Sequence, residues 1–319
     1  MMSHDLPQRR LRTLVESRFQ AFADDVLHAK SWAERDAATQ AAREKRRRDF
    51  VAAIGIDLKK FDAGLEKDNR AQEAELKSFL AEYRLKSAGR PSHRAADARV
   101  AALQSELLAQ SGHMVLPSVA ASIFASDKAK LVGISYDQPW VDGPIDSGWV
   151  MPDDPSLIRI MDSEHYPNAL CWDNRQTPYP QFSSHFTFTP ADTGTYEMVA
   201  VLGFHGFYVL RCDDSWWNCR DAGVRLTARM NAHQYFDIGW QDAPTLLDVE
   251  KDNTEEVTNF DRTFFLDYTT QLRGGDPVVV TVNGTVMAYA HGGGAYAELN
   301  FADGTANYIQ PLFLSVQRV

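Results

Sequence analysis

Apolar positions in the first part of the chain recur with a helical period. Residues 8–88 contain no proline, and their only glycines are Gly55 and Gly64. The apolar side chains step in alternating threes and fours, which is the period of a coiled-coil seam. We therefore predict long helices, followed by a shorter one that ends near Gly112. The predicted seam consists of Val15, Phe19, Phe22, Val26, Val51, Ile54, Leu58, Phe61 and Leu65.

Two arrangements of this helical region fit the pattern. The stretch from Gln8 to Ile54 favours one helix of about 45 residues, whose single apolar stripe needs a partner chain. The alternative is a hairpin of helices within one chain, folded near Gly55 or within residues 36–49. We favour a homo-oligomer assembled through the seam.

After residue 130 the pattern changes to runs of aromatic and β-branched residues separated by turn signals. In "VRLTARM" (residues 224–230), Arg225, Thr227 and Arg229 alternate with apolar residues, as in a half-buried strand. "PVVVTVNGTVMAYA" (residues 277–290) places Asn283-Gly284 between two β runs, which predicts a hairpin with a type I′ turn. Strands are also expected at residues 182–189 and on both sides of a turn at Asp303-Gly304. Strands without interleaved helices predict a β-sandwich or jelly roll.

A short motif supports the sandwich. "PADTGTYEM" (residues 190–198) resembles the tyrosine corner of immunoglobulin-like sandwiches. The resemblance implies that the Tyr196 hydroxyl bonds back across a turn shaped by Asp192 and Gly194. Met198 stands where an antibody-type domain carries a cysteine, so the resemblance extends to the sandwich and not to family membership.

The predicted fold class is thus α then β, with coiled-coil-like helices followed by an antiparallel β-sandwich. We expect a helical assembly or anchoring domain at residues 1–112. Residues 113–180 would form a linker and the first β elements, and residues 181–319 a recognition domain.

The charge of the chain is divided in the same way. Residues 1–112 hold 21 basic and 17 acidic side chains, whereas the remainder holds 12 and 26, for a net charge of −10. A nucleic-acid reader needs a basic face, so the acidic second part argues against that class. The run "REKRRRD" (residues 43–49) is interrupted by acids and is interpreted as a solvated helix face.

Features of secreted and membrane proteins are not found in the sequence. The N-terminal stretch has no apolar core of a signal peptide, and no apolar run reaches the length of a membrane span. We therefore expect cytoplasmic synthesis, with release by a signal-independent route left open. The three cysteines, an odd number, argue against a disulfide framework.

Motifs of catalysis and metal binding are equally missing from the sequence, so we expect no enzyme activity, cofactor or metal. "HGGG" (residues 291–294) is interpreted as a tight turn. The single histidines are interpreted as structural residues. Asp248, Glu250 and Asp252 have calcium-loop spacing, but Asn253 and Asn259 stand where the loop needs glycine and glutamate. A solvated acidic loop is therefore expected there.

The most unusual stretch is "RCDDSWWNCRD" (residues 211–221), between two predicted strands. Adjacent strand residues point to opposite faces, so one of Trp216 and Trp217 should be exposed. An exposed indole beside polar side chains suits a sugar ring or a protein partner. The alternative is a loop that folds both indoles over the sandwich edge. The predicted binding residues are Asp213, Asp214, Trp216, Trp217 and Asn218.

We expect a structural or binding protein in which helices anchor or assemble a β-sandwich that recognises a glycan or protein receptor. Helices that anchor or assemble a β-sandwich recognition domain occur in fibres and appendages of phage-like particles. The first alternative is a soluble toxin with membrane-acting helices. The second is a glycan-active enzyme, because paired carboxylates on a β scaffold are compatible with the sequence.

Overall fold

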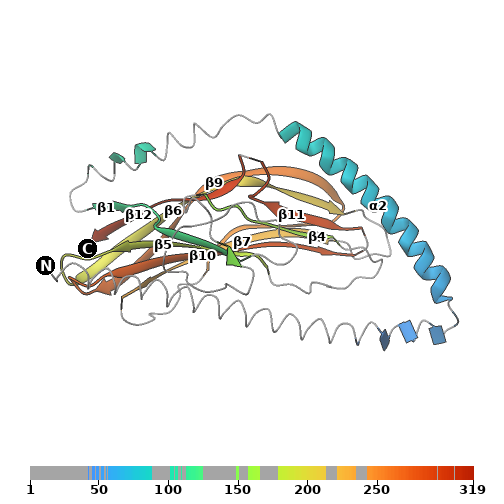
Figure 1. The fold of residues 1–319 in the computed structure, drawn as a ribbon, viewed down its shortest axis with the longest axis horizontal. Helices are drawn as coiled ribbons and strands as arrows, with labels where there is room; N and C mark the ends of the chain where they lie inside the picture. The colour runs from blue at the N-terminus through green and yellow to red at the C-terminus, as the bar shows by residue number, and fades with distance from the viewer. Residues whose placement is uncertain are drawn as a thin grey trace.

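Two antiparallel β-sheets pack face to face and form most of the structure (Figure 1). The computed structural model describes residues 57–87, 113–124, 149–150, 157–165, 179–212, 221–234, 243–292, 294–304 and 306–319, with scattered positions at 42–55 and 101–109. The sandwich part of the predicted fold class is confirmed, whereas its helical part is wrong. In the described residues, helix is confined to α2 (Leu58–Ser87) and short stretches on either side of it.

The predicted helical seam breaks at Gly55. This residue has a φ of 89°, a left-handed conformation that glycine adopts at helix ends. The Asp57 carboxylate then accepts hydrogen bonds from the Lys59 and Lys60 amides at 3.0 and 3.3 Å, which starts α2 as a separate helix. Leu58, Phe61 and Leu65 lie in α2. The other predicted seam positions, Val15, Phe19, Phe22, Val26, Val51 and Ile54, lie outside the described residues.

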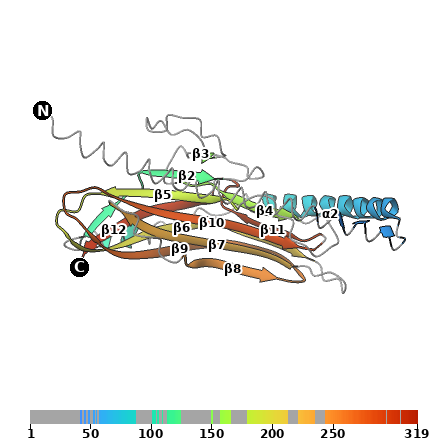
Figure 2. The same cartoon turned by 90° about the horizontal axis from the view of Figure 1, so that it is seen from below.

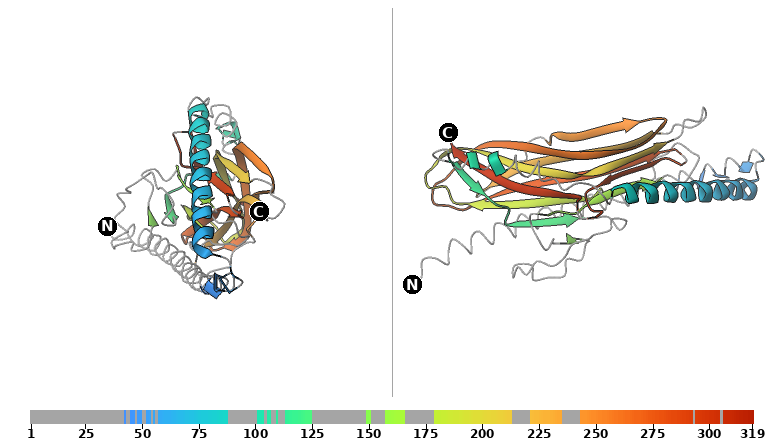
Figure 3. Two further views of the ribbon diagram at one scale, coloured as in Figure 1. Left: turned by 90° about the vertical axis from the view of Figure 1, so that its right-hand side faces the viewer. Right: turned by 90° about the horizontal axis from the view of Figure 1, so that it is seen from above.

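Helix α2 is docked on the sandwich of its own chain. Its ion pair joins Glu75 to Arg211, with 3.3 Å between the Oε2 and Nη2 atoms. Figures 1 and 3 show α2 at one end of the sandwich, with its N-terminal part projecting past the strands. The apolar contact joins Phe79 and Leu80 to Phe207, Val209 and Tyr296. One stripe of the predicted helical region is therefore used within the chain.

The first sheet, sheet A, is organised around one long strand. Strand β6 pairs with β9 along one edge, and with β12 and then β11 along the other; β1 and β4 lie outside these. Sheet A consists of β1 (His113–Leu116), β4 (Met161–His165), β6 (Gly194–Cys212), β9 (Thr254–Leu272), β11 (Tyr296–Asn300) and β12 (Tyr308–Arg318).

The second sheet, sheet B, has the order β3-β2-β5-β10-β7-β8, with β8 at its margin (Figure 2). It consists of β2 (Ala120–Phe124), β3 (Trp149–Val150), β5 (Gln181–Phe188), β7 (Asp221–His233), β8 (Thr245–Lys251) and β10 (Val278–His291). The predicted strands at residues 182–189 and 224–230 are confirmed as parts of β5 and β7. Strands β11 and β12 lie on either side of Gly304, which has a φ of 76°.

The predicted hairpin at Asn283-Gly284 is wrong. Strand β10 runs straight through both residues, and Gly284 pairs with Phe182 on one side and Ala228 on the other. The glycine has a packing role, because a Cβ atom there would lie 2.2 Å from the Phe182 ring. A dipeptide that is typical of turns is used here to bring an aromatic ring close to the backbone.

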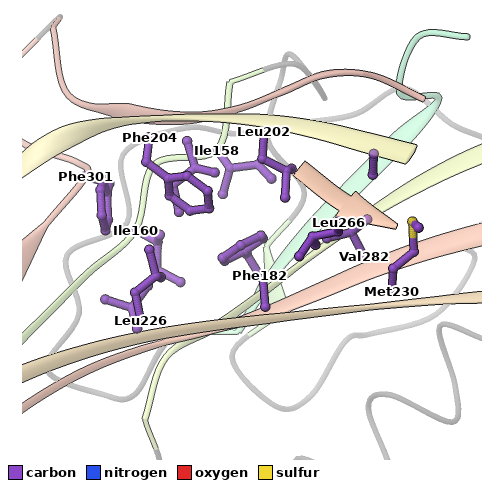
Figure 4. Close-up of a cluster of buried hydrophobic side chains, with 14 of the residues drawn as sticks. Ile158, Ile160, Phe182, Leu202, Phe204, Leu226, Met230, Leu266, Val282 and Phe301 are labelled. Carbon is purple, nitrogen blue, oxygen red and sulfur yellow. The ribbon is translucent and has the colours of Figure 1, made fainter. Parts of the chain in front are cut away.

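The core lies between the two sheets and is rich in phenylalanine (Figure 4). Phe204 of β6 has its ring centroid 6.3 Å from that of Phe182 in β5 and 5.8 Å from that of Phe301. All three side chains are completely buried. These edge-on contacts join sheet A to sheet B.

The tyrosine corner forms as the sequence predicts. The Tyr196 hydroxyl donates a hydrogen bond to the Asp192 carbonyl oxygen at 2.7 Å, and the tyrosine is buried. Arg318 of β12 holds the other side of the turn through the Asp192 carboxylate at 2.9 Å. The corner thereby fixes the entry of the chain into β6.

Candidate functional site

The outward face of sheet B carries mostly polar side chains. In β7 the even-numbered positions, including Val224 and Leu226, are buried in the core, whereas Arg225, Thr227 and Arg229 point outward and are partly exposed. This confirms the predicted alternation. Strand β10 follows the same rule, with Thr285, Met287, Tyr289 and His291 partly exposed on the outward face. Polar positions from neighbouring strands thus meet on one surface.

Several strand ends meet at one end of the sandwich, which we call the His291 end. The register places Asp221, the first residue of β7, opposite His291, the last of β10. Their side chains interact, with 2.7 Å between the His291 Nδ1 and Asp221 Oδ1 atoms, and both are about one-third exposed. Gly292 and Gly294 follow with φ of 82° and 83°, so the predicted tight turn at "HGGG" is confirmed.

Tyr289 lies flat across the neighbouring strand at this end. A Cβ atom on Gly223 would lie 2.3 to 2.5 Å from the phenol ring, so only glycine leaves room for it. The Tyr289 hydroxyl passes over β7 and donates to Glu250 of β8 at 3.0 Å. Burial and this hydrogen bond raise the pKa of Tyr289, so the hydroxyl keeps its proton. The His291 ring lies 6.0 Å from the tyrosine ring.

An ion pair lies beside the ring. Arg225 and Asp248 are in contact, with 2.9 Å between the Nη2 and Oδ2 atoms, and this carboxylate raises the pKa of Arg225. Asp248 and Glu250 belong to β8, so their predicted placement in an acidic loop is wrong; alternation along the strand turns both toward the site. The Arg225 Nε atom is buried and has no hydrogen-bond partner in the structure.

A second polar network lies further along the same face. His185 contacts Ser183 through Nε2 at 3.2 Å and Thr281 through Nδ1 at 3.1 Å. Ser183 donates its hydroxyl proton to Asn283 Oδ1 at 2.8 Å, so His185 Nε2 donates to the serine. The Asn283 Nδ2 atom is buried and has no hydrogen-bond partner in the structure.

The predicted binding residues Asp213, Asp214, Trp216, Trp217 and Asn218 lie outside the described residues. Their segment joins Cys212 to Asp221. Both of these residues lie at the His291 end, because the Cys212 thiol contacts the carbonyl of Lys251 in β8, and Lys251 pairs with Ala222, the neighbour of Asp221. Cys212 is buried.

Sequence analysis missed Tyr289, His291, Asp221 and Glu250 as a group. The alternation in "TVMAYAH" could have placed Tyr289 and His291 on one face, but the predicted hairpin cut this strand in two. Their pairing with β7 and β8 depends on a register between distant segments, and the sequence carries no local signal for it.

The described residues contain no group of three or more His, Cys, Asp or Glu side chains arranged to hold a metal ion. They also contain no helix that is long and apolar enough to cross a membrane.

Comparisons with known proteins show only distant similarity. No protein-family model matches the chain, and no curated protein does. A family 35 carbohydrate binding module from Clostridium thermocellum is 8% identical over 66% of this chain and 100% of that one, with a TM-score of 0.21. Eiger TNF from S. frugiperda is 14% identical over 64% and 93%, with a TM-score of 0.18. An isomalto-dextranase from Arthrobacter globiformis T6, complexed with panose, is 12% identical over 53% and 24%, with a TM-score of 0.16. Likenesses this low carry no inference about function.

Proposed function

We propose that this chain is a non-enzymatic binding protein that takes a glycan on the outward face of sheet B at the His291 end. The observation that carries the proposal is the Tyr289 ring, held flat over Gly223 with carboxylates around its rim. A flat aromatic ring offers an apolar surface to the C–H face of a sugar, while polar groups at its edge bind hydroxyls.

The groups around Tyr289 match the hydrogen-bonding needs of sugar hydroxyls. Asp221 and Glu250 accept hydrogen bonds, and His291, whose Nδ1 atom contacts Asp221, adds a second ring nitrogen at an outward position of β10. Each of these side chains is already positioned by a partner within the sheet, so little conformational entropy is lost on binding. The site is thus built on strands and needs no rearrangement of the described residues.

The wider role proposed from the sequence is compatible with this site. In that proposal, residues 1–112 anchor or assemble the chain, and the sandwich presents the site, as in a fibre or appendage. A homo-oligomer stays a prediction, which the solution mass of the full chain at micromolar concentration tests. A monomer would contradict it.

The binding proposal is tested by calorimetric titration of the full chain with a panel of neutral hexasaccharides. We expect at least one to bind the wild type. Tyr289→Ala should weaken that binding at least tenfold, as at other aromatic binding residues. Tyr289→Phe keeps the ring, loses only the hydrogen bond to Glu250, and should retain most of the affinity.

Controls separate binding from folding and from catalysis. Thr263→Ala, an outward position of β9 in sheet A, should bind like the wild type. Equal affinity of Tyr289→Ala and the wild type would contradict the proposal. Release of shorter sugars during incubation with the wild type would instead favour a glycan-active enzyme.

A further inference from the structure

The outward positions beyond Tyr289 along the middle of sheet B are mostly polar, and they change from partly exposed at Thr285 to buried at Asn283. We call the outward positions of β7 and β10 between Tyr289 and Asn283 the lane. The register pairs Thr285 with Thr227 and Asn283 with Arg229, so the lane is two strands wide. Six residues of extended strand separate Tyr289 from Asn283, which is about 20 Å. The lane consists of Arg225, Thr227, Arg229, Asn283, Thr285 and Met287.

Two hydrogen-bond donors in the lane lack an acceptor. The Arg225 Nε and Asn283 Nδ2 atoms are both buried and make no hydrogen bond in the structure. They lie on the same outward face, because the core takes the even-numbered positions of β7 and the odd-numbered positions of β10 face away from it. Buried donors without acceptors are costly and uncommon in native proteins. An oxygen-rich ligand that spans the lane would supply an acceptor to each.

The charges select a neutral ligand. Asp221, Asp248 and Glu250 gather at the Tyr289 end, and Arg225 is already paired with Asp248. A polyanionic chain would meet like charges there. Between this end and Asn283, β10 presents Met287 and Thr285, which carry no charge, and the one further cation of the lane, Arg229 of β7, already has an interaction within the protein.

We infer that the ligand is a neutral oligosaccharide chain that lies along β10 from Tyr289 to Asn283, with its oxygens accepting hydrogen bonds from Arg225 and Asn283. This inference rests on the proposed glycan binding at Tyr289 and assigns that site a substrate class, a linear chain of several sugar units. A single sugar bound at Tyr289 does not reach Asn283 at the far end of the lane.

The inference is tested by comparing disaccharides with hexasaccharides of glucose, xylose and mannose, and with a galacturonic acid hexamer. For the neutral sugar that binds, the hexamer should bind at least tenfold more tightly than the dimer, and the acidic hexamer more weakly than the neutral hexamers. Thr285→Trp places a large side chain in the lane, so it should reduce hexamer affinity to that of the dimer and leave dimer binding unchanged.

A second variant and a control complete the experiment. Thr227 of β7 lies opposite Thr285, so Thr227→Trp blocks the lane at the same point and replaces Thr285→Trp in the experiment if that variant does not fold. Thr263→Trp, on the outward face of sheet A, should bind both ligands like the wild type. Equal affinities of dimer and hexamer for the wild type would overturn the lane while leaving Tyr289 as a binding site. If no sugar binds at all, the proposed function fails with it.

Discussion

The outward faces of the two sheets differ in what they offer to other molecules. Sheet A presents Phe207, Val209 and Tyr296, which pack against α2 of the same chain. Sheet B presents mostly hydrogen-bonding side chains at the outward positions of β7 and β10. One face is therefore covered in part by the apolar side chains of a helix, and the other is suited to a polar ligand.

The same difference appears in how buried polar groups find partners. On sheet A, Glu298 is buried and accepts hydrogen bonds from Tyr296 and, at 2.6 Å, from Asn300, all within β11. On sheet B, Asn283 and Arg225 keep buried donors without acceptors. Among the described residues, sheet A leaves one buried acceptor without a partner, Glu256 Oε1 of β9, whereas the buried donors without acceptors lie in sheet B, and such donors point to a ligand.

The largest effect on stability is expected from a change in the core that the two sheets share. Phe204→Ala empties a core site that joins both sheets, and should lower the free energy of unfolding by about 3–5 kcal/mol. Chemical denaturation followed by circular dichroism and by tyrosine fluorescence measures this. Two separate transitions would show that the sheets unfold independently, and the two faces would then not belong to one folded body.

A smaller effect confined to sheet B is expected from Gly284→Ala. The added Cβ atom overlaps the Phe182 ring and should lower the free energy of unfolding by about 1–3 kcal/mol. Phe182→Leu in the same background should recover part of this loss, since the overlap is relieved. Additive losses in the double variant would contradict the packing role of this glycine.

A comparable loss of stability in sheet A is expected from a change in the tyrosine corner. Tyr196→Phe removes the hydrogen bond to the Asp192 carbonyl and should cost about 1 kcal/mol of stability. Thermal unfolding of the variant measures it, with sugar binding at sheet B as the internal control. A loss of binding affinity without a loss of stability would contradict the assignment of this residue to sheet A alone.

Helix α2, which packs on sheet A, is expected to contribute still less to stability. Phe79→Ala removes one of the apolar contacts that the described side chains of α2 make with the sandwich, and Glu75 keeps only an exposed ion pair. Amide exchange should become faster in α2 and stay unchanged in β6. Unchanged exchange in α2 would mean that the contact with Phe207 and Val209 does not hold the helix.

Much of the sandwich could be predicted because its signals are local. The alternation in β7 and the tyrosine corner each depend on fewer than ten neighbouring residues. Asn283-Gly284 failed for the same reason, since its local turn preference is overridden by the packing of a ring from β5. The site at Tyr289 needs three strands in register, and nothing near Tyr289 in the sequence identifies Glu250 as its partner.

The smallest expected effect tests the protonation of the site itself. Burial and the hydrogen bond to Glu250 raise the pKa of Tyr289 above its ordinary value of 10.0. The folded chain therefore holds the phenolic proton at a pH where the unfolded chain has released it. This contribution to stability is complete below about pH 10 and is lost as the pH rises further.

Urea unfolding of the wild type and Tyr289→Phe between about pH 9 and pH 12 isolates this contribution, because the other tyrosines are common to both chains. The wild type should lose more stability over this range than the variant, by a fraction of the full one-proton slope because the ring is partly exposed. Parallel curves would mean that the Tyr289 hydroxyl titrates alike in the folded and unfolded chains. In that case the bond to Glu250 does not persist in solution, and the position of the ring would depend on its packing over Gly223 alone.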